Sequence, residues 1–183
     1  MNKTVVIFQS KYGYTERYAR WIGEALDCPV LKRKNCSAKT LATYDTILYG
    51  GGLYAGSVNG LKLLVRNRQL LSGKNVILFT CGLADPTDSE NAARIRKALS
   101  RSVPPELLEK IRLFHLRGGM DYSGLSLAHR AMISMMRKML LKKDENELSD
   151  EDRMLIDIYE KCIDFTNRES IAPLISFVSE ITA

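Results

Sequence analysis

Residues 4–15 read Thr-Val-Val-Ile-Phe-Gln-Ser-Lys-Tyr-Gly-Tyr-Thr, a short apolar run that ends in a loop of hydroxyl residues around one glycine. The run from Thr4 to Phe8 is β-branched and continuously apolar, which is typical of a strand that a parallel sheet buries on both faces. From Glu16 onward the apolar residues recur at helical spacing, at Tyr18, Ile22, Ala25 and Leu26. The stretch therefore predicts a strand, a loop and a helix in immediate succession.

The loop from Ser10 to Thr15 lies at the N-terminus of the expected helix. Backbone N–H groups without intrahelical partners point out of such an end, and the helix dipole adds partial positive charge. The hydroxyls of Ser10 and Thr15 add donors, and Gly13 can adopt a positive φ or let backbone approach a ligand closely. We expect a cradle for a phosphate dianion, and its residues are Ser10, Lys11, Tyr12, Gly13, Tyr14 and Thr15. The alternative is an ordinary turn capped by Thr15.

The rest of the chain alternates strands and helices. Apolar runs predict strands at 30–34, 46–49, 75–79 and 111–116. Helical spacing predicts a helix that begins near Gly60, a helix over 87–99 with a Thr87/Glu90 capping box, and a helix over 149–162. A final helix is expected to begin at a Ser170 cap and to run to the end of the chain. Residues 37–44 leave room for only a turn or a short helix. Alternation of this kind predicts a parallel sheet with helices on both faces.

Three of the expected strands run into segments of glycine or small residues, namely Ser10 to Thr15, Gly50 to Gly56, and Thr80 to Asp85. In sheets of this kind, ligands bind outside the carboxyl ends of the strands. The three loops together therefore predict a phosphorylated ligand across this edge of the sheet.

The loop Ser10-Lys11-Tyr12-Gly13-Tyr14-Thr15 resembles the phosphate loop of flavodoxin-like FMN proteins, Ser/Thr-x-Thr/Tyr-Gly-x-Thr. The resemblance implies a doubly wound, five-stranded parallel sheet in the order 2-1-3-4-5 and non-covalently bound FMN. It also implies a single domain over residues 1–183, with a helical insertion at 120–148 after the last strand. The stretch from Gly118 to Lys143, with its run from Ala131 to Met139, resembles the menaquinone-dependent protoporphyrinogen dehydrogenase branch.

Two of the loops are expected to hold the flavin ring. Gly51 and Gly52, before Leu53, form a peptide that can change orientation at low steric cost and so meet the flavin N5. Tyr54 is the aromatic side chain expected to stack on or flank the ring. The pyrimidine edge is expected to receive hydrogen bonds from the backbone of Thr80, Cys81, Gly82 and Leu83.

The remaining polar and sulfur residues do not suggest a metal or thiol centre. Four cysteines, Cys28, Cys36, Cys81 and Cys162, are scattered without a C-x-x-C pair, and the chain has two histidines that lie far apart. We expect Cys81 to be a small buried filler rather than a redox thiol, and His115 to be a hydrogen-bonded core residue. No catalytic residue is identified from the sequence.

The insertion contains an amphipathic helix with an unusual methionine face, formed by Ala128, Met132, Met135, Met136 and Met139. Its basic residues, Arg130, Arg137, Lys138 and Lys142, lie mostly elsewhere. Three interpretations remain open: a helix of the core, a lid over the flavin that shapes a substrate or quinone pocket, or a peripheral membrane contact through residues 125–143.

The sequence favours an FMN-dependent oxidoreductase that passes electrons from a reduced substrate to an acceptor such as a quinone. The resemblance adds protoporphyrinogen as a substrate. The alternative is a flavodoxin-type electron carrier without its own substrate pocket, but carriers of this fold tend to be acidic and this chain has a formal charge of +6. A signal peptide, a membrane span and nucleic-acid signatures are missing, so we expect a cytoplasmic protein. The oligomeric state is left open.

Overall fold

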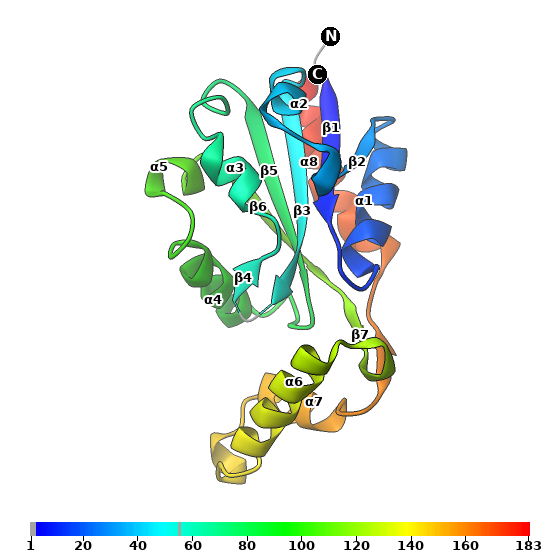
Figure 1. The fold of residues 1–183 in the computed structure, drawn as a ribbon, viewed down its shortest axis with the longest axis vertical. Coiled ribbons are helices and arrows are strands. Elements are labelled where there is room, and N and C mark those ends of the chain that lie inside the picture. Colours follow the sequence, from blue (N-terminus) through cyan, green and yellow to red (C-terminus); the bar gives the residue numbers. More distant parts are fainter. Residues whose placement is uncertain (1–2, 55) are drawn as a thin grey trace. The chain divides into compact units, whose positions relative to one another are not determined.

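The computed structural model describes residues 3–54 and 56–183, and the chain divides into two compact units. The first, here called the sheet unit, comprises Met1–Gly118 and Thr166–Ala183. The second, here called the insert unit, comprises Gly119–Phe165. Figure 1 shows the sheet and its helices in the first unit and a helical pair in the second.

A parallel sheet forms the centre of the sheet unit. Its strands are β1 (Thr4–Gln9), β2 (Val30–Lys32), β3 (Thr46–Tyr54), β5 (Asn75–Gly82) and β6 (Arg112–Arg117). They follow the spatial order β2-β1-β3-β5-β6, and all of their pairings are parallel. This confirms the expected flavodoxin-like order. A short strand, β4 (Ser57–Val58), pairs antiparallel with the end of β3 and closes a hairpin there.

Helices cover both faces of this sheet because successive strand residues point to opposite sides. Val6 and Phe8 of β1 pack into one apolar cluster, while Val5 and Ile7 pack into another. The first cluster includes residues of α1 (Tyr14–Ala25) and α8 (Ala172–Thr182). The second includes residues of four helices, α2 (Ala38–Ala42), α3 (Lys62–Arg66), α4 (Ser89–Leu99) and α5 (Pro105–Leu108).

β3 and β5 are longer than the sequence suggests, and each includes a segment that was expected to be loop. Gly50–Gly52 pairs with Phe79–Cys81 in unbroken parallel register. A Cβ on Gly50 would lie 2.1 Å from Cζ of Phe79, so the glycine makes room for the phenylalanine ring. The glycines are therefore strand residues that allow close packing. Ala55, within the expected loop, lies outside the described residues.

Two helix starts differ from those expected. The N-cap of α4 is Asp88, whose carboxylate accepts from the N–H of Glu90 at 2.8 Å, so the predicted Thr87 capping box is wrong. Thr87 instead donates its hydroxyl to Asp85 at 2.7 Å. α8 follows a 3₁₀ turn, η4 (Arg168–Ile171), that contains the expected cap Ser170, and Pro173 lies in the first turn of α8 as expected.

The insert unit begins with a short strand, β7 (Gly119–Asp121), which pairs antiparallel with β8 (Cys162–Asp164) near its end. Between them lie α6 (Leu127–Leu140) and α7 (Asp150–Asp157). Ser149 caps α7 in a capping box with Asp152. The expected continuation of that helix to Cys162 is wrong, because α7 ends at Asp157 and Cys162 begins β8.

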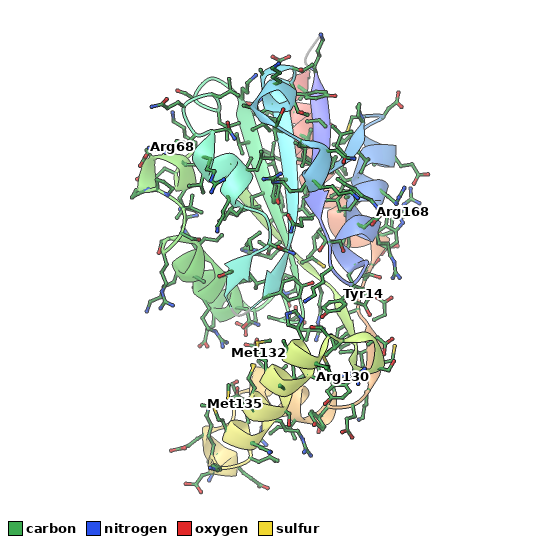
Figure 2. All side chains as sticks on the ribbon, viewed as in Figure 1. Tyr14, Arg68, Arg130, Met132, Met135 and Arg168 are labelled. Atoms are coloured by element: carbon green, nitrogen blue, oxygen red, sulfur yellow. The ribbon has the colours of Figure 1, made fainter. Side chains whose placement is uncertain are left out.

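The insert unit itself does not cover the methionine face of α6. Met135 is 59% exposed and Met139 is 62% exposed, and the neighbouring Leu127 is 84% exposed. The opposite face carries the buried Leu140 together with Arg130 and Arg137. Figure 2 labels Met132, Met135 and Arg130 on this helix. No helix among the described residues is long and apolar enough to cross a lipid bilayer.

The hydroxyl of Tyr18 joins three parts of the sheet unit. Tyr18, on α1, is fully buried. Its hydroxyl donates to the carbonyl of Arg117 at the end of β6 (2.7 Å) and accepts from the N–H of Asn167 before α8 (3.1 Å). The two backbone groups flank the positions where the chain leaves the sheet unit and returns to it.

Replacing Tyr18 with Phe is expected to lower the free energy of unfolding by about 1–3 kcal/mol, because two backbone groups lose the buried hydroxyl to which they are hydrogen-bonded. Denaturant unfolding followed by circular dichroism measures this loss. Tyr44→Phe removes the hydroxyl of a half-buried tyrosine on the opposite face and should change stability much less. Equal effects of the two substitutions would contradict this role of Tyr18.

Candidate functional site

The carboxyl ends of the central strands lie side by side, and this brings the predicted segments together. Gln9 at the end of β1 is in register with Gly51 of β3, and Gly51 is in register with Thr80 of β5. Thr80 is in turn beside His115 of β6. The three segments expected to hold a flavin therefore share one edge of the sheet unit.

The loop between β1 and α1 has the geometry expected of an anion cradle. Gly13 is the N-cap of α1 with φ 95° and ψ −29°, and no described side chain caps the helix. The alternative of a Thr15 cap is therefore wrong. The hydroxyl of Ser10 accepts from the N–H of Gly13 at 3.0 Å and fixes the turn. A Cβ on Gly13 would meet no atom within 4 Å, so the loop is open on that side.

The other residues of this loop surround the opening. Thr15 lies in the first turn of α1 and is 3% exposed. Lys11 places its ammonium 5.5 Å from the ring centroid of Tyr12, and the Arg17 guanidinium lies 5.8 Å from the ring of Tyr14. Cationic and aromatic groups thus flank the end of the helix.

Two tyrosine rings from different segments meet at this edge. The rings of Tyr12 and Tyr54 are 6.1 Å apart at an interplanar angle of 68°, which is an edge-to-face arrangement. Burial raises the pKa of Tyr54 to about 12, so its hydroxyl keeps its proton at neutral pH. A Cβ on Gly52 would lie 2.7 Å from Cε2 of Tyr54. The missing side chain at Gly52 therefore allows the position of the Tyr54 ring.

Hydrogen bonds through Asn59 hold the glycine segment. The N–H of Asn59 donates to the carbonyl of Gly52 at 2.9 Å, and the Asn59 carbonyl accepts from the hydroxyl of Tyr49 at 3.0 Å. The Asn59 side chain accepts from the Gln9 amide at 2.9 Å. A Cβ on Gly51 would lie 2.8 Å from the Asn59 carbonyl oxygen. In this structure, therefore, packing explains Gly51 and Gly52, and the positive φ values occur later, at Gly56 and Gly60.

The end of β5 is tied to β6. Oγ1 of Thr80 and Nδ1 of His115 share a hydrogen bond of 2.8 Å, and burial lowers the pKa of His115, which keeps the imidazole neutral at neutral pH. Cys81 is buried, and a Cβ on Gly118 would lie 2.8 Å from its sulfur. The N–H of Gly118 donates to the carbonyl of Gly82 at 2.6 Å. His115 is hydrogen-bonded as expected but only half-buried, whereas Cys81 is buried as expected.

Arg117 and Asp85 position the segment after β5, and the sequence analysis did not identify either residue for this role. Nε of Arg117 donates to the carbonyl of Leu83 at 3.2 Å, and its Nη1 lies 3.3 Å from a carboxylate oxygen of Asp85. Hydrogen bonds from Thr87, assisted by the Arg117 charge, lower the pKa of Asp85. The sequence does not show that Arg117 lies beside Gly82, because that pairing depends on the register between β5 and β6.

Among the described residues there is no group of three or more His, Cys, Asp or Glu side chains that could hold a metal ion. The polar groups described above at the sheet edge include backbone amides, hydroxyls and cationic side chains. Such donors suit an anionic or polar organic ligand.

One known family matches most of the chain. The model of the flavodoxin domain family matches residues 5–148. Comparison with curated proteins gave no match. Among solved structures, oxidised Flavodoxin 1 from Bacillus cereus is 20% identical, with 63% of this chain and 84% of that chain covered and a TM-score of 0.44.

Two further structures are similar at the same level. The two-electron reduced flavodoxin of Megasphaera elsdenii is 17% identical, with coverage of 61% and 82% and a TM-score of 0.43. The Trp repressor binding protein of Bacillus subtilis is 14% identical, with coverage of 63% and 85% and a TM-score of 0.46. The assignment rests on the domain match and on the observed strand order, and by these the chain belongs to the flavodoxin domain family.

Proposed function

We propose that the protein binds FMN at the carboxyl edge of its sheet and transfers electrons through it. The observation that carries the proposal is the loop from Ser10 to Thr15, which ends at a helix N-terminus and opens beside Gly13. Family membership supports the same cofactor.

The residues at this edge fit FMN in three respects. Backbone N–H groups and the hydroxyls of Ser10 and Thr15 suit a phosphate, as helix N-termini do in general. The space beside Gly13 leaves room for it. The rings of Tyr12 and Tyr54 offer aromatic surface for a flavin ring.

When bound, FMN supplies one- and two-electron chemistry, and the chain's own residues hold and orient it. The loop after β1 anchors the phosphate end. Tyr54, kept protonated by burial, offers a neutral apolar flank. The contact of Arg117 with the carbonyl of Leu83 fixes the segment whose backbone is proposed to face the pyrimidine edge.

We further propose that the protein is an oxidoreductase with a hydrophobic acceptor such as a quinone, and that protoporphyrinogen is its candidate reduced substrate. The support is the exposed apolar face of α6, which includes Leu127, Met135 and Met139. Methionine side chains adapt to irregular apolar guests. A carrier without a substrate pocket would have no need of such a face.

The same face supports a proposed contact with an anionic membrane surface. Lys138 and Lys142 are exposed, and Lys138 lies on the apolar side of α6. Arg130 and Arg137 are not available in the same way, because their guanidinium groups lie over the rings of Tyr122 and Tyr159 at 5.8 and 4.6 Å. The two lysines are therefore the residues proposed to meet lipid headgroups.

Thr15→Ala is expected to weaken FMN binding by about 10- to 100-fold, as the loss of a hydrogen bond to a charged group does. Riboflavin, which lacks the phosphate, should lose far less affinity. Quenching of flavin fluorescence measures both. Thr43→Ala, at the end of α2, is the matched control and should leave both affinities unchanged. Equal losses for the two flavins, or no FMN binding by the unaltered protein, would contradict the assignment.

Gly52→Ala is expected to displace the ring of Tyr54, because the new Cβ would lie 2.7 Å from Cε2. FMN affinity and the reduction potential of bound FMN should both change, and overpacking should lower stability by about 1–3 kcal/mol. Flavin titration and denaturant unfolding measure these effects. Gly73→Ala, where a Cβ would meet nothing within 4 Å, is the control. If Gly52→Ala leaves both the FMN affinity and the reduction potential unchanged, Tyr54 is not part of the flavin site.

Replacing Leu127, Met135 and Met139 together with Gln is expected to reduce turnover with a long-chain quinone while FMN affinity is kept. Leu70→Gln is the control, since Leu70 is an exposed leucine (38%) of the sheet unit. Steady-state reduction of a quinone and of a small soluble dye separates acceptor binding from flavin reduction. If the triple variant reduces quinone normally, the face does not serve the acceptor and the carrier alternative gains support.

Replacing Lys138 and Lys142 with Gln is expected to weaken cosedimentation with phosphatidylserine vesicles by about tenfold or more, because each basic residue near an anionic surface contributes about 1 kcal/mol. Lys97 and Lys110, exposed on the sheet unit, provide the matched double control. Sedimentation that is identical for both double variants, or absent in the unaltered protein, would contradict the membrane contact.

A further inference from the structure

A cavity of the sheet unit lies beside the phosphate loop, and Ser10 is the one residue of the proposed flavin site among its described lining residues. It has a volume of about 460 Å³, within the roughly 300–1,000 Å³ of small-molecule pockets. Its polar lining comes from the end of β1, the end of β2, the 3₁₀ turn η1 (Arg33–Asn35) and the first turn of α1, with residues Gln9, Ser10, Glu16, Lys32, Arg33 and Lys34.

The lining carries an excess of positive charge. Three consecutive cations, Lys32, Arg33 and Lys34, face one carboxylate, Glu16. That carboxylate already lies 2.6 Å from the guanidinium of Arg20 and 3.7 Å from the ammonium of Lys32. The charges of Arg33 and Lys34 are therefore not matched by the acidic group of the cavity.

Arg33 holds an unmet hydrogen-bond donor. Its Nη1 makes a long contact of 3.5 Å with the carbonyl of Cys36. Its Nε is buried, and within 3–54 and 56–183 it has no hydrogen-bond partner. The Nε atoms of Arg130 and Arg137 are in the same situation, so the buried Nε does not by itself mark a site. The outer nitrogens of the Arg33 guanidinium are the donors that would bond an anionic oxygen, with a charge-assisted bond.

Protection of the edge strand does not account for these features. Charged residues on β2 do discourage pairing with another chain, as edge lysines generally do. Lys32 and Lys34 are exposed and can serve that role. Edge protection does not require a cavity lined by three cations and one carboxylate. The combination is better suited to binding an anion.

We propose that this cavity is an anion site that binds a small organic molecule through a phosphate or carboxylate group, with Arg33 and Lys34 as the principal cations. Gly13 and Thr15 do not line the cavity, so it is distinct from the phosphate loop. Ser10 borders both sites, and its hydroxyl already accepts from the N–H of Gly13. The proposal does not depend on the identity of the flavin.

The test uses the full chain with saturating FMN, which occupies the phosphate loop, and isothermal titration with two probes. Pyrophosphate represents phosphate ligands, and citrate represents carboxylate ligands. At least one probe should bind, and Arg33→Gln and Lys34→Gln should each weaken that probe by about tenfold or more, the effect of losing a charge-assisted hydrogen bond. Lys39→Gln, on α2 outside the cavity, should bind as the unaltered protein does.

A second arm separates the cavity from the phosphate loop. Without FMN the phosphate loop can also take pyrophosphate, and Thr15→Ala should weaken only that second binding event. The event that Arg33→Gln and Lys34→Gln weaken should persist when FMN is present. If neither probe binds in the presence of FMN, or if Arg33→Gln and Lys34→Gln bind normally, the proposal is wrong. A chain that binds a probe in the expected way yet fails to bind FMN would instead contradict the proposed function and leave the anion site standing.

Discussion

Parallel hydrogen bonding between β1, β3, β5 and β6 is the constraint on which the structure depends. The ladder runs without interruption from Thr4 beside Thr46 to Gly82 beside Arg117. Its central strands are buried on both faces, so register cannot slip without moving apolar side chains out of two separate cores. Every segment of the candidate flavin site is the continuation of one of these strands. The pairing of the strands therefore fixes where these segments begin.

Close approach at the glycines of β3 links this ladder to the site. Gly50 makes room for the ring of Phe79 in the core, and Gly52 makes room for the ring of Tyr54 at the edge. Between them, Gly51 lies against Val58 of β4 and against Asn59, which follows that strand. Three consecutive glycines thus serve three different neighbours. Core packing and the placement of an aromatic side chain at the site are consequences of the same stretch of sequence.

The insert unit shows how an amphipathic helix can turn its basic side inward. The guanidinium of Arg137 lies 4.6 Å from the ring of Tyr159, and that of Arg130 lies 5.8 Å from the ring of Tyr122. The two tyrosine hydroxyls are 3.2 Å apart. Cation–π contacts and arginine stems cover the tyrosine rings, so aromatic and arginine side chains supply the packing that methionines would otherwise give. The insert unit itself leaves the methionine side exposed.

The sequence by itself determined the first strand, the loop at Gly13 and the helix after it, because these depend on local periodicity and on the freedom of one glycine. It also determined the alternation that produces a parallel sheet, while the strand order came from the resemblance to flavodoxins. Only the tertiary structure decided how far β3 and β5 extend, since a strand ends where its neighbours stop pairing. It also decided that Arg117 holds Leu83 and Asp85, and that Arg33 lies in a cavity beside β2, because both depend on residues distant in the chain. The sequence shows the apolar face of α6 as a periodic pattern, but such a pattern does not tell which side of the helix packs. In the structure Tyr122 and Tyr159 of the insert unit pack against the arginine side of α6.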